Sequence, residues 1–262
     1  MRVYPTPRTR NSGNPPAPPR MPAPTLDFKI AFLEGLLSQF GERPIRILDM
    51  GCGTAKDWPG ILRSRPWVTY VGLEPNSKNR SVANELLHGL PAEVLAGWGE
   101  AMNAHESFDL TVSLSVLEHV KYLDSFLRAS VTATRPGGTV VHRYDLGHSL
   151  YPATDYERLL VVVSRRMPWI VPASRFTSHL DPSRVARILG ELGLSRVEVS
   201  YAQMYSLKQA MNRLSRIENG RELAECVLAL DADVGRAVRP VVTDHEMAHL
   251  FPSVIVRGVR EP

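Results

Sequence analysis

The chain has 262 residues, of which 44% are hydrophobic and 22% charged. That length and balance predict one large α/β domain, or one domain with a helical elaboration, and a globular enzyme is the default expectation. Its two cysteines, Cys52 and Cys226, exclude a disulfide framework. No secretory signal and no run of about 18 apolar residues occurs, so a cytoplasmic location without a membrane partner is expected.

The net charge of +4 arises at one end of the chain. Residues 1–24 contain four arginines, eight prolines and no acid, so the remainder carries 27 basic and 27 acidic side chains. A neutral body argues against a broad nucleic-acid-binding face, and no nucleic-acid partner is expected. The composition of residues 1–24 predicts a disordered tail, either a solvated extension or a docking arm, ahead of a folded domain at 25–262.

Strand and helix patterns alternate along the first half of the chain. An apolar repeat over 26–40 predicts an entry helix that stops at Gly41. The expected helices between strands cover 57–65, 76–90 and 120–134. The expected strands cover 45–49, 68–73, 92–95, 108–114 and 138–144. This is the spacing of βαβ units, so a doubly wound, mainly parallel, Rossmann-like sheet is predicted.

The regular alternation of strand and helix patterns ends after Asp145. Strands are predicted at 197–201 and 253–259, and the last is expected to run antiparallel and to complete a seven-stranded sheet. Helices are predicted at 151–166, 181–192, 207–217 and 221–236. The segments 146–180 and 205–250 are therefore expected as helical inserts in a position to cover a site.

The first strand ends in a glycine-rich turn at 51–55, and ligands bind at such strand ends in open α/β sheets. Gly51 and Gly53 allow a sharp turn and a close approach of backbone to ligand. Asp49 is an acceptor placed beneath the turn. Lys56 stands where the G-x-G-x-x-G dinucleotide pattern has its third glycine, which disfavours a nicotinamide oxidoreductase.

Five features in this order resemble the class I S-adenosylmethionine-dependent methyltransferases. They are ILDMGCGT at 47–54, Glu74 at the end of the second strand, GEA at 99–101, the segment from FDL to LEHV at 108–120, and RPGG at 135–138. The resemblance covers about 30–145 and the closing strands. It implies S-adenosylmethionine as cofactor, and the neutral body favours a small-molecule acceptor.

The resemblance also implies how the cofactor is held. Gly51 and Gly53 would border its methionyl part, and Asp49 would hold the turn or the ammonium group. Glu74 would accept hydrogen bonds from both ribose hydroxyls. Ala55 replaces a glycine common in the family, so less backbone freedom but no loss of binding is expected. The complete implied set is Asp49, Gly51, Cys52, Gly53, Glu74, Pro75, Glu100 and Ala101 beside the adenine, and Ser113 and Leu114 at the floor.

Transfer to a hydroxyl requires a base or a metal, and the candidates follow the fourth and fifth strands. His148 is the candidate base, and Asp145 would fix its tautomer. The alternative is that both residues shape their loop by bonding to backbone. His119 is the third catalytic candidate.

The Leu-Glu-His-Val segment also resembles one in ubiquinone-pathway and small-RNA-terminal O-methyltransferases, where a Glu three positions earlier joins Glu and His on a divalent metal. Ser115 stands at that position, so no metal is expected, and Glu118 and His119 could simply pack and cap a helix start. His245 and His249 are four residues apart but lack a third ligand.

The leading hypothesis is a small-molecule O-methyltransferase that uses S-adenosylmethionine. An N- or C-methyltransferase is the alternative within the enzyme class. A non-catalytic partner protein of the same fold, with residues 1–24 as docking arm, is the alternative outside it. The sequence does not indicate an oligomeric state.

Overall fold

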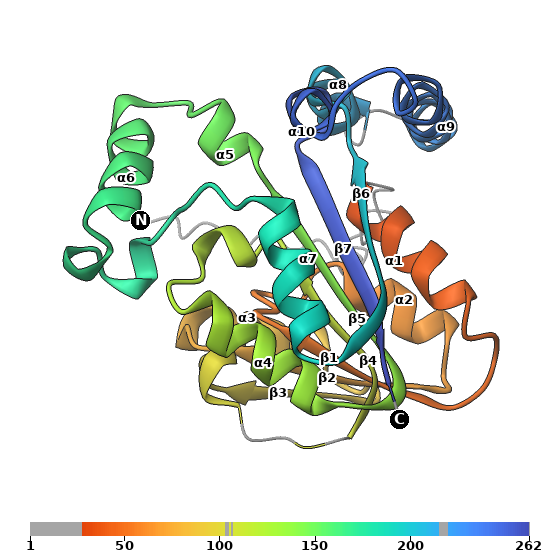
Figure 1. Cartoon of the computed structure of the whole chain (residues 1–262). Coiled ribbons are helices and arrows are strands. Elements are labelled where there is room, and N and C mark those ends of the chain that lie inside the picture. Colours follow the sequence, from red (N-terminus) through yellow and green to blue (C-terminus); the bar gives the residue numbers. More distant parts are fainter. Residues whose placement is uncertain (1–27, 103–104, 106, 215–219, 262) are drawn as a thin grey trace, which may run out of the picture.

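The computed structural model describes residues 28–102, 105, 107–214 and 220–261. Within these residues seven strands form one sheet in the order β3-β2-β1-β4-β5-β7-β6 (Figure 1). Strands β1 to β5 pair in parallel, and β7 runs antiparallel to both of its neighbours. The predicted mainly parallel seven-stranded sheet with an antiparallel last strand is confirmed. The expected tail at 1–24 lies outside the described residues.

The strands are apolar because helices cover both faces of the sheet. In the central strand β1, Ile47, Leu48 and Met50 are fully buried. The sheet comprises β1 (Ile45–Met50), β2 (Val68–Glu74), β3 (Ala92–Ala96), β4 (Phe108–Leu114), β5 (Thr134–Asp145), β6 (Leu194–Ala202) and β7 (Ser253–Arg260).

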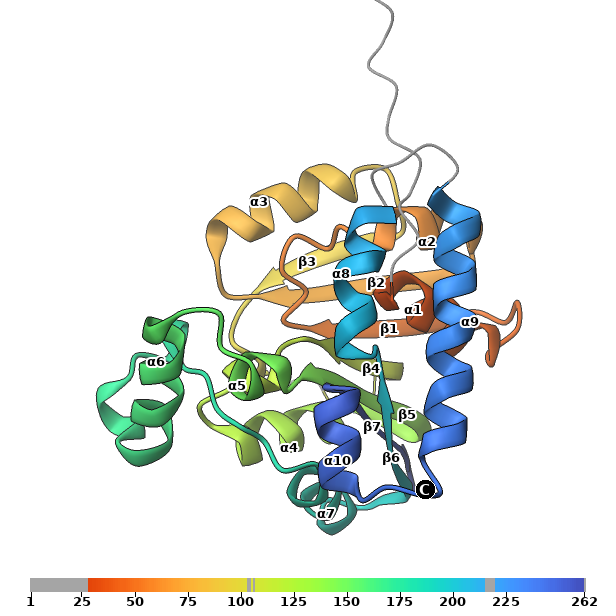
Figure 2. The same cartoon turned by 90° about the horizontal axis from the view of Figure 1, so that it is seen from above.

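Two helical layers enclose the sheet (Figures 1 and 2). One apolar core lies between the sheet and α1 (Phe28–Ser38), α2 (Trp58–Ser64) and α3 (Ser77–Leu86). The other lies between the sheet and α4 (Leu123–Ala133) and α7 (Pro182–Glu191). Because β1 to β5 are parallel, their carboxyl ends share one edge, and the polar residues singled out from the sequence gather there.

The expected insert segments contain further helices. They are α5 (Gly147–Leu150), α6 (Asp155–Arg166), the short 3-10 turns η3 (Pro168–Ile170) and η4 (Ala173–Arg175), α8 (Tyr205–Leu214), α9 (Gly220–Val238) and α10 (Asp244–Leu250). Helix α6 begins four residues later than predicted, because Thr154 accepts a hydrogen bond from the Glu157 N–H and caps it there. Helix α10 was not predicted as an element, although Thr243 and Glu246 form a capping box that the sequence displays.

Strand β5 begins at Thr134, earlier than expected, so the Arg-Pro-Gly-Gly stretch lies inside the strand. The pairing of β5 with β4 shifts register between Phe108 and Leu110, which pair with Thr134 and Thr139. Gly137, among the extra residues of β5 at this shift, adopts a φ of +73°. A bulge therefore accommodates the residues that the sequence pattern indicated as a break.

The longest described helix is α9, with 19 residues. Charged residues such as Glu222, Asp231 and Arg236 recur along it. Among the helices in the described part of the chain, none combines the length and the apolar character needed to cross a membrane.

A buried imidazole links β4, β5 and α4. His142 is fully buried; its Nδ1 lies 2.8 Å from Ser113 Oγ and its Nε2 3.1 Å from Ser130 Oγ. The Ser130 hydroxyl donates to the Leu127 carbonyl at 2.7 Å, so it accepts from Nε2–H, and Nδ1 accepts from Ser113. The neutral ring is thus fully hydrogen-bonded, and burial lowers the pKa of His142 to about 3.

We expect His142 to make the protein sensitive to acid. Between pH 6.5 and about 3 the unfolded imidazole binds a proton that the folded one does not, so the free energy of unfolding falls as pH falls. One such proton contributes a slope of at most about 1.4 kcal/mol per pH unit. Urea unfolding from pH 4 to 7 should show a shallower pH dependence for His142→Gln than for the wild type. Equal slopes would contradict the assignment, since the carboxyl groups are common to both proteins.

Candidate active site

A buried carboxylate holds the turn after β1. Asp49 Oδ2 accepts hydrogen bonds from Trp58 Nε1 at 2.7 Å and from the Tyr70 hydroxyl at 3.0 Å. Oδ1 is also buried and has no hydrogen-bond partner among the described residues. Burial raises the pKa of Asp49 to about 6. A cationic donor placed at Oδ1 would therefore stabilise the ionised carboxylate.

Glu74 faces the same turn from the end of β2. Its Oε2 accepts from the Gly53 N–H at 3.0 Å, and its Oε1 accepts from the Asn76 N–H at 2.9 Å. The residue is only 7% exposed, yet it lines a cavity. A carboxylate offers about four acceptor positions. Capacity therefore remains for hydroxyl donors from that cavity.

Two cavities adjoin along the glycine turn. A cavity of about 240 Å³ lies over the turn itself, and a second of about 460 Å³ lies over the ends of β2, β3 and β4. Gly51 and Ser115 line both. Of the residues implied by the resemblance, the smaller cavity is lined by Asp49, Gly51, Cys52, Gly53 and Leu114, and the larger by Gly51, Glu74, Pro75 and Glu100.

Two residues of the implied set are placed elsewhere. The Ser113 side chain is fully buried and bonds to His142, because it faces the core between β4 and α4 rather than the strand end. Ala101 is exposed and lines neither cavity, since the short turn η1 (Gly99–Ala101) directs Glu100 there instead. The floor assigned to Ser113 is formed by Ser115 and Val116.

Other lining residues were not anticipated from the sequence. Trp98, after β3, is 46% exposed and lines the larger cavity. Lys29, near the start of α1, lines the smaller one. An aromatic residue between Gly97 and Gly99 is a signal that could have identified Trp98. Lys29 has no such signal, because the fold alone brings α1 to the turn.

Gly51→Ala tests the geometry of the turn. Gly51 has a φ of +83°, and a Cβ there would lie 2.8 Å from Val116 Cγ2. We expect the free energy of unfolding in urea to fall by about 2 kcal/mol or more, from the left-handed backbone and the clash together. Gly53→Ala is the control: its φ is +58° and no atom lies within 4 Å, so a loss of about 1 kcal/mol is expected. Equal losses would show that the contact with Val116 costs nothing.

At Ala55 the turn adopts a left-handed backbone conformation without a glycine. This residue is buried and adopts a φ of +51° although it is not glycine. The turn therefore adopts a left-handed conformation at this position without glycine, at a cost of roughly 1 kcal/mol. That alanine causes no loss of binding stays a prediction.

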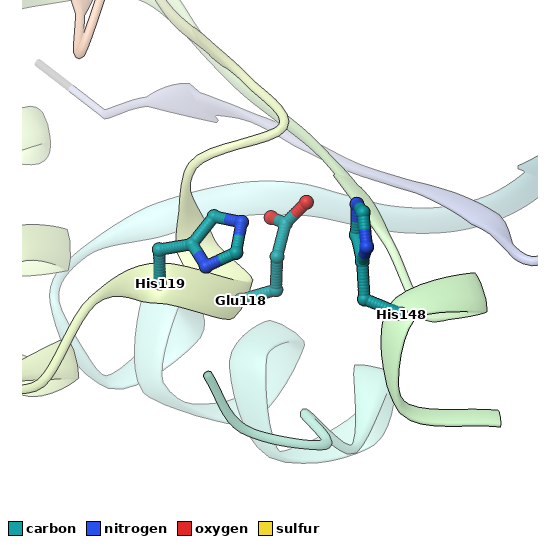
Figure 3. Close-up of side chains that lie close together, drawn as sticks. All are labelled: Glu118, His119 and His148. Carbon is teal, nitrogen blue, oxygen red and sulfur yellow. The ribbon is translucent and has the colours of Figure 1, made fainter. Parts of the chain in front are cut away.

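Glu118, His119 and His148 converge at the carboxyl edge of the sheet (Figure 3). Glu118 and His119 come from the short turn η2 (Leu117–His119), and His148 comes from α5. One ligand atom of each residue lies within 4.8 Å of those of the other two. The Glu118 carboxylate lies between the two imidazoles, whose centroids are 5.7 Å apart.

The three side chains are in different states. Glu118 is 1% exposed; its Oε1 accepts from the Asp145 N–H at 3.2 Å, and its Oε2 has no partner within the described chain. Burial raises the pKa of Glu118 to about 7. His119 Nδ1 lies 3.2 Å from the Phe176 carbonyl, so Nδ1–H donates and Nε2 is left as an acceptor. Burial also lowers the pKa of His119.

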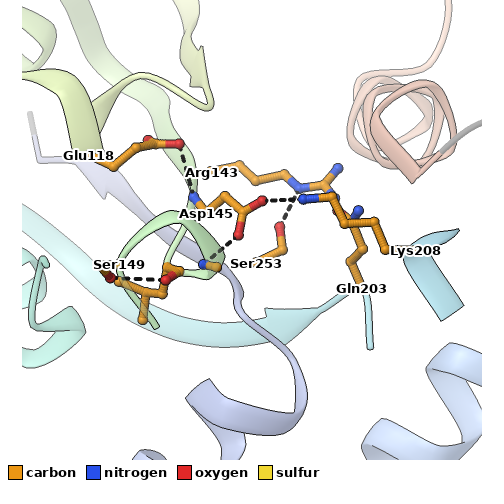
Figure 4. A network of polar contacts seen from close by, with 9 residues as sticks. Glu118, Arg143, Asp145, Ser149, Gln203, Lys208 and Ser253 are labelled. Atoms are coloured by element: carbon orange, nitrogen blue, oxygen red, sulfur yellow. Dashed lines mark hydrogen bonds and ion pairs between the residues drawn. The ribbon is translucent and has the colours of Figure 1, made fainter. Parts of the chain in front are cut away.

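Asp145 does not orient His148, in contrast to the sequence hypothesis. Its Oδ1 accepts from the Gly147 N–H at 2.7 Å, and its Oδ2 forms an ion pair with Lys208 Nζ of α8 at 2.6 Å (Figure 4). Asp145 thus shapes its loop, as the alternative interpretation held. The carboxylate beside His148 is instead Glu118, which the sequence had suggested only as a metal ligand or packing residue.

The remaining histidines lie apart from this cluster. His179 Nδ1 bonds to Ser149 Oγ at 2.9 Å. The rings of His245 and His249 are 4.7 Å apart on α10, and no third metal-ligating side chain joins them within the part of the chain that the structure describes.

The aromatic residues of the first insert have divided roles. Phe176 is buried and, with Tyr156, lines a cavity of about 600 Å³ that adjoins His119. Tyr151 stacks on Tyr205 with centroids 4.3 Å apart. Trp169 is 72% exposed. These aromatic residues therefore form neither a single cavity lining nor a single core.

Comparison with known proteins identifies the family. Residues 28–199 match the family model described as "Methyltransferase domain", and the chain belongs to that family. It is 32% identical over 103 residues to a ubiquinone biosynthesis O-methyltransferase of Rhizobium etli strain CIAT 652, covering 37% of this chain and 39% of that protein. The protein of that name from Cupriavidus pinatubonensis is 27% identical over 200 residues, covering 69% and 74%. The chain thus matches about two fifths of the length of the first of these relatives.

Solved structures show the same fold. Phosphoethanolamine N-methyltransferase 2 of Haemonchus contortus, in complex with S-adenosyl-L-methionine, superposes with a TM-score of 0.59 at 14% identity, covering 88% of this chain and 53% of that one. A putative sarcosine dimethylglycine methyltransferase from Galdieria sulphuraria has a TM-score of 0.57 at 15% identity, covering 89% and 84%. At such identities the likeness concerns the fold alone.

Proposed function

We propose that the protein is an S-adenosylmethionine-dependent methyltransferase that methylates a hydroxyl group of a small molecule. The observation that carries this proposal is the continuity of the site. The two cavities meet at Gly51 and Ser115, and the larger one is also lined by His119 of the Glu118–His119–His148 cluster. A cofactor pocket and a group of acid–base side chains therefore adjoin at the carboxyl edge.

The residues present fit the cofactor. Asp49 lines the smaller cavity, and its Oδ1 has no hydrogen-bond partner among the described residues, which suits the ammonium group of the methionyl part. In the larger cavity Glu74 retains acceptor capacity for ribose hydroxyls, and Trp98 and Glu100 offer an aromatic face and an acceptor to the adenine. The bound cofactor supplies an electrophilic methyl group, and the chain has to align an acceptor atom with it.

The hydroxyl of the acceptor has to lose its proton, and the cluster is placed to take it. Glu118 has an unpartnered buried oxygen and a pKa of about 7, close to the value that suits a base at neutral pH. His119 offers Nε2 as a second acceptor, because its Nδ1 is occupied. We assign the base role to this cluster, with His148 beside Glu118, rather than to an Asp145–His148 pair.

A divalent metal in the same cluster is a second candidate, favoured by one observation. Glu118, His119 and His148 form a two-histidine, one-carboxylate set within 4.8 Å, and such a set can hold a catalytic metal with an open position. Ser115 supplies no carboxylate, so the ion would be held by three side chains. It would act there as a Lewis acid on the acceptor oxygen. Metal analysis of the purified protein, before and after dialysis against a chelator, separates the two candidates.

Thermal unfolding with S-adenosylmethionine, S-adenosylhomocysteine, NAD or buffer tests the cofactor assignment. Ligand at about 100 times its dissociation constant adds roughly 2.7 kcal/mol, a shift of several degrees. We expect a shift with the two adenosyl ligands and none with NAD. No shift of the melting temperature with either adenosyl ligand would favour a non-catalytic role. That alternative is a partner protein of the same fold, because a fold does not by itself determine a function.

Product analysis then identifies the acceptor atom. A screen of phenols, alcohols, amines and activated carbon acids with radiolabelled cofactor should label hydroxyl compounds. If the product is methylated at nitrogen or carbon, and still forms in a variant that lacks the base cluster, the assignment to oxygen is overturned. The cofactor assignment would remain intact.

A further inference from the structure

Exposed apolar side chains are concentrated on one projection of the protein. Of the large hydrophobic residues that are exposed in the described chain, a group falls in and just after α6. Trp169 is 72% exposed, Leu159 61% and Ile170 57%. We call this group the α6–η3 surface; it comprises Tyr156, Leu159, Val162, Met167, Trp169 and Ile170.

The projection stands away from the sheet. Both views show α6 at the outer end of the first insert, separated from the helices that pack on the sheet (Figures 1 and 2). Leu159, Val162 and Arg166 are exposed and repeat at helical spacing, whereas Ser164 on the inward side is buried. The outward face of α6 and the turn η3 thus carry the exposed apolar side chains of this projection.

Arginine side chains border this surface. Arg158 pairs with Asp155, and the only other acid of α6, Glu157, accepts a hydrogen bond from the Ala153 N–H. Arg165 and Arg166 are exposed and have no acidic partner in the part of the chain that the structure describes. The apolar side chains are therefore bordered by positive charge that is not neutralised nearby.

We propose that the α6–η3 surface docks the protein onto an anionic lipid surface. A helix that alternates apolar and arginine side chains on its outer face can bury the apolar ones among acyl chains while the guanidinium groups remain with the headgroups. Tryptophan is favoured at that boundary, and Trp169 is among the most exposed side chains of the projection. Lipid is favoured over a protein partner because the exposed apolar side chains stand beside arginines that no acid neutralises among the described residues.

The surface adjoins the candidate active site. Tyr156 and Leu160 of α6 line the cavity of about 600 Å³ that also contains His119. Docking would therefore bring a lipid headgroup region next to the base cluster. The proposal goes beyond the sequence expectation of no membrane partner, which rested on the lack of a spanning segment.

Vesicle co-sedimentation of the full chain tests the proposal. We expect binding to vesicles of phosphatidylcholine with about 30% phosphatidylglycerol, and at least about tenfold weaker partitioning into pure phosphatidylcholine. Trp169→Ser with Ile170→Ser should weaken binding to the anionic vesicles at least about tenfold. Arg165→Gln with Arg166→Gln should weaken it several-fold and reduce its salt dependence.

The matched control is Leu230→Ser with Val241→Ser, which removes two exposed apolar side chains, 50% and 78% exposed, away from α6. The four arginines of residues 1–24 are present in every variant, so their attraction to anionic lipid cancels in the comparison. Circular dichroism should show equal melting for all variants. Unchanged vesicle binding of the Trp169–Ile170 variant would overturn the proposal. So would a wild-type dimer in light scattering that this variant abolishes, because the surface would then bind a second copy. Neither readout depends on cofactor or acceptor.

Discussion

Glu74→Ala is expected to raise the dissociation constant for S-adenosylmethionine at least about 100-fold. The carboxylate is the acidic group at the end of β2 in the larger cavity, and two ribose hydroxyls would share its oxygens. Charge-assisted hydrogen bonds contribute about 1.5–3 kcal/mol each, so the loss of two of them exceeds the factor of 100. Calorimetric titration of the purified variant measures the effect directly.

The variant also loses three contacts within the protein. Glu74 accepts from the Gly53 and Asn76 N–H groups and from Asn79 Nδ2, so its removal loosens the turn and should lower the free energy of unfolding by about 1–3 kcal/mol. Titration well below the melting temperature keeps folding and binding separate. Glu93→Ala, an exposed glutamate on the neighbouring strand β3, is the matched control and should bind as the wild type does. A change of less than about threefold in Glu74→Ala would contradict the placement of the ribose.

The sheet and the cofactor cavity could be predicted from the sequence because both depend on local patterns. Strands β1, β2 and β4 are mainly apolar, a glycine turn follows β1 and an acid ends β2, and the order of these features identifies the fold. Residues at the strand ends, such as Asp49 and Glu74, therefore lie where expected. Ser113 does not, because whether a residue near a strand end faces the core or the cavity depends on the exact point at which the strand stops.

The base cluster was predicted only in part, for a different reason. His119 and His148 were identified by residue type, but the partner of His148 was taken to be its sequence neighbour Asp145. That carboxylate is bound by Lys208, 63 positions further along the chain. The carboxylate that lies beside His148 is the buried Glu118. Sequence spacing does not reveal which of two acids a distant lysine neutralises, so this choice required the structure.

Glu118→Gln is expected to lower kcat for the methylated acceptor by about 10²- to 10⁴-fold, the usual effect of removing a general base. Glutamine has the same size and can keep the acceptor for the Asp145 N–H, so the fold and KM should change little. Asp145→Asn is expected to have a much smaller effect, because its side chain bonds to Gly147 and Lys208 and not to the cluster.

Steady-state kinetics of three variants distinguish the candidate arrangements, with Glu191→Gln, an exposed surface glutamate paired with Arg187, as the control for the change from acid to amide. If Asp145→Asn were as damaging as Glu118→Gln, the Asp145–His148 pair proposed from the sequence would be the better description. If Glu118→Gln retained kcat within about threefold, Glu118 would have no catalytic role. Metal content decides whether Glu118 acts as a metal ligand or as a base. If the wild type holds a stoichiometric ion that Glu118→Gln loses, Glu118 is a metal ligand. If the metal-free wild type is equally active, Glu118 is a base.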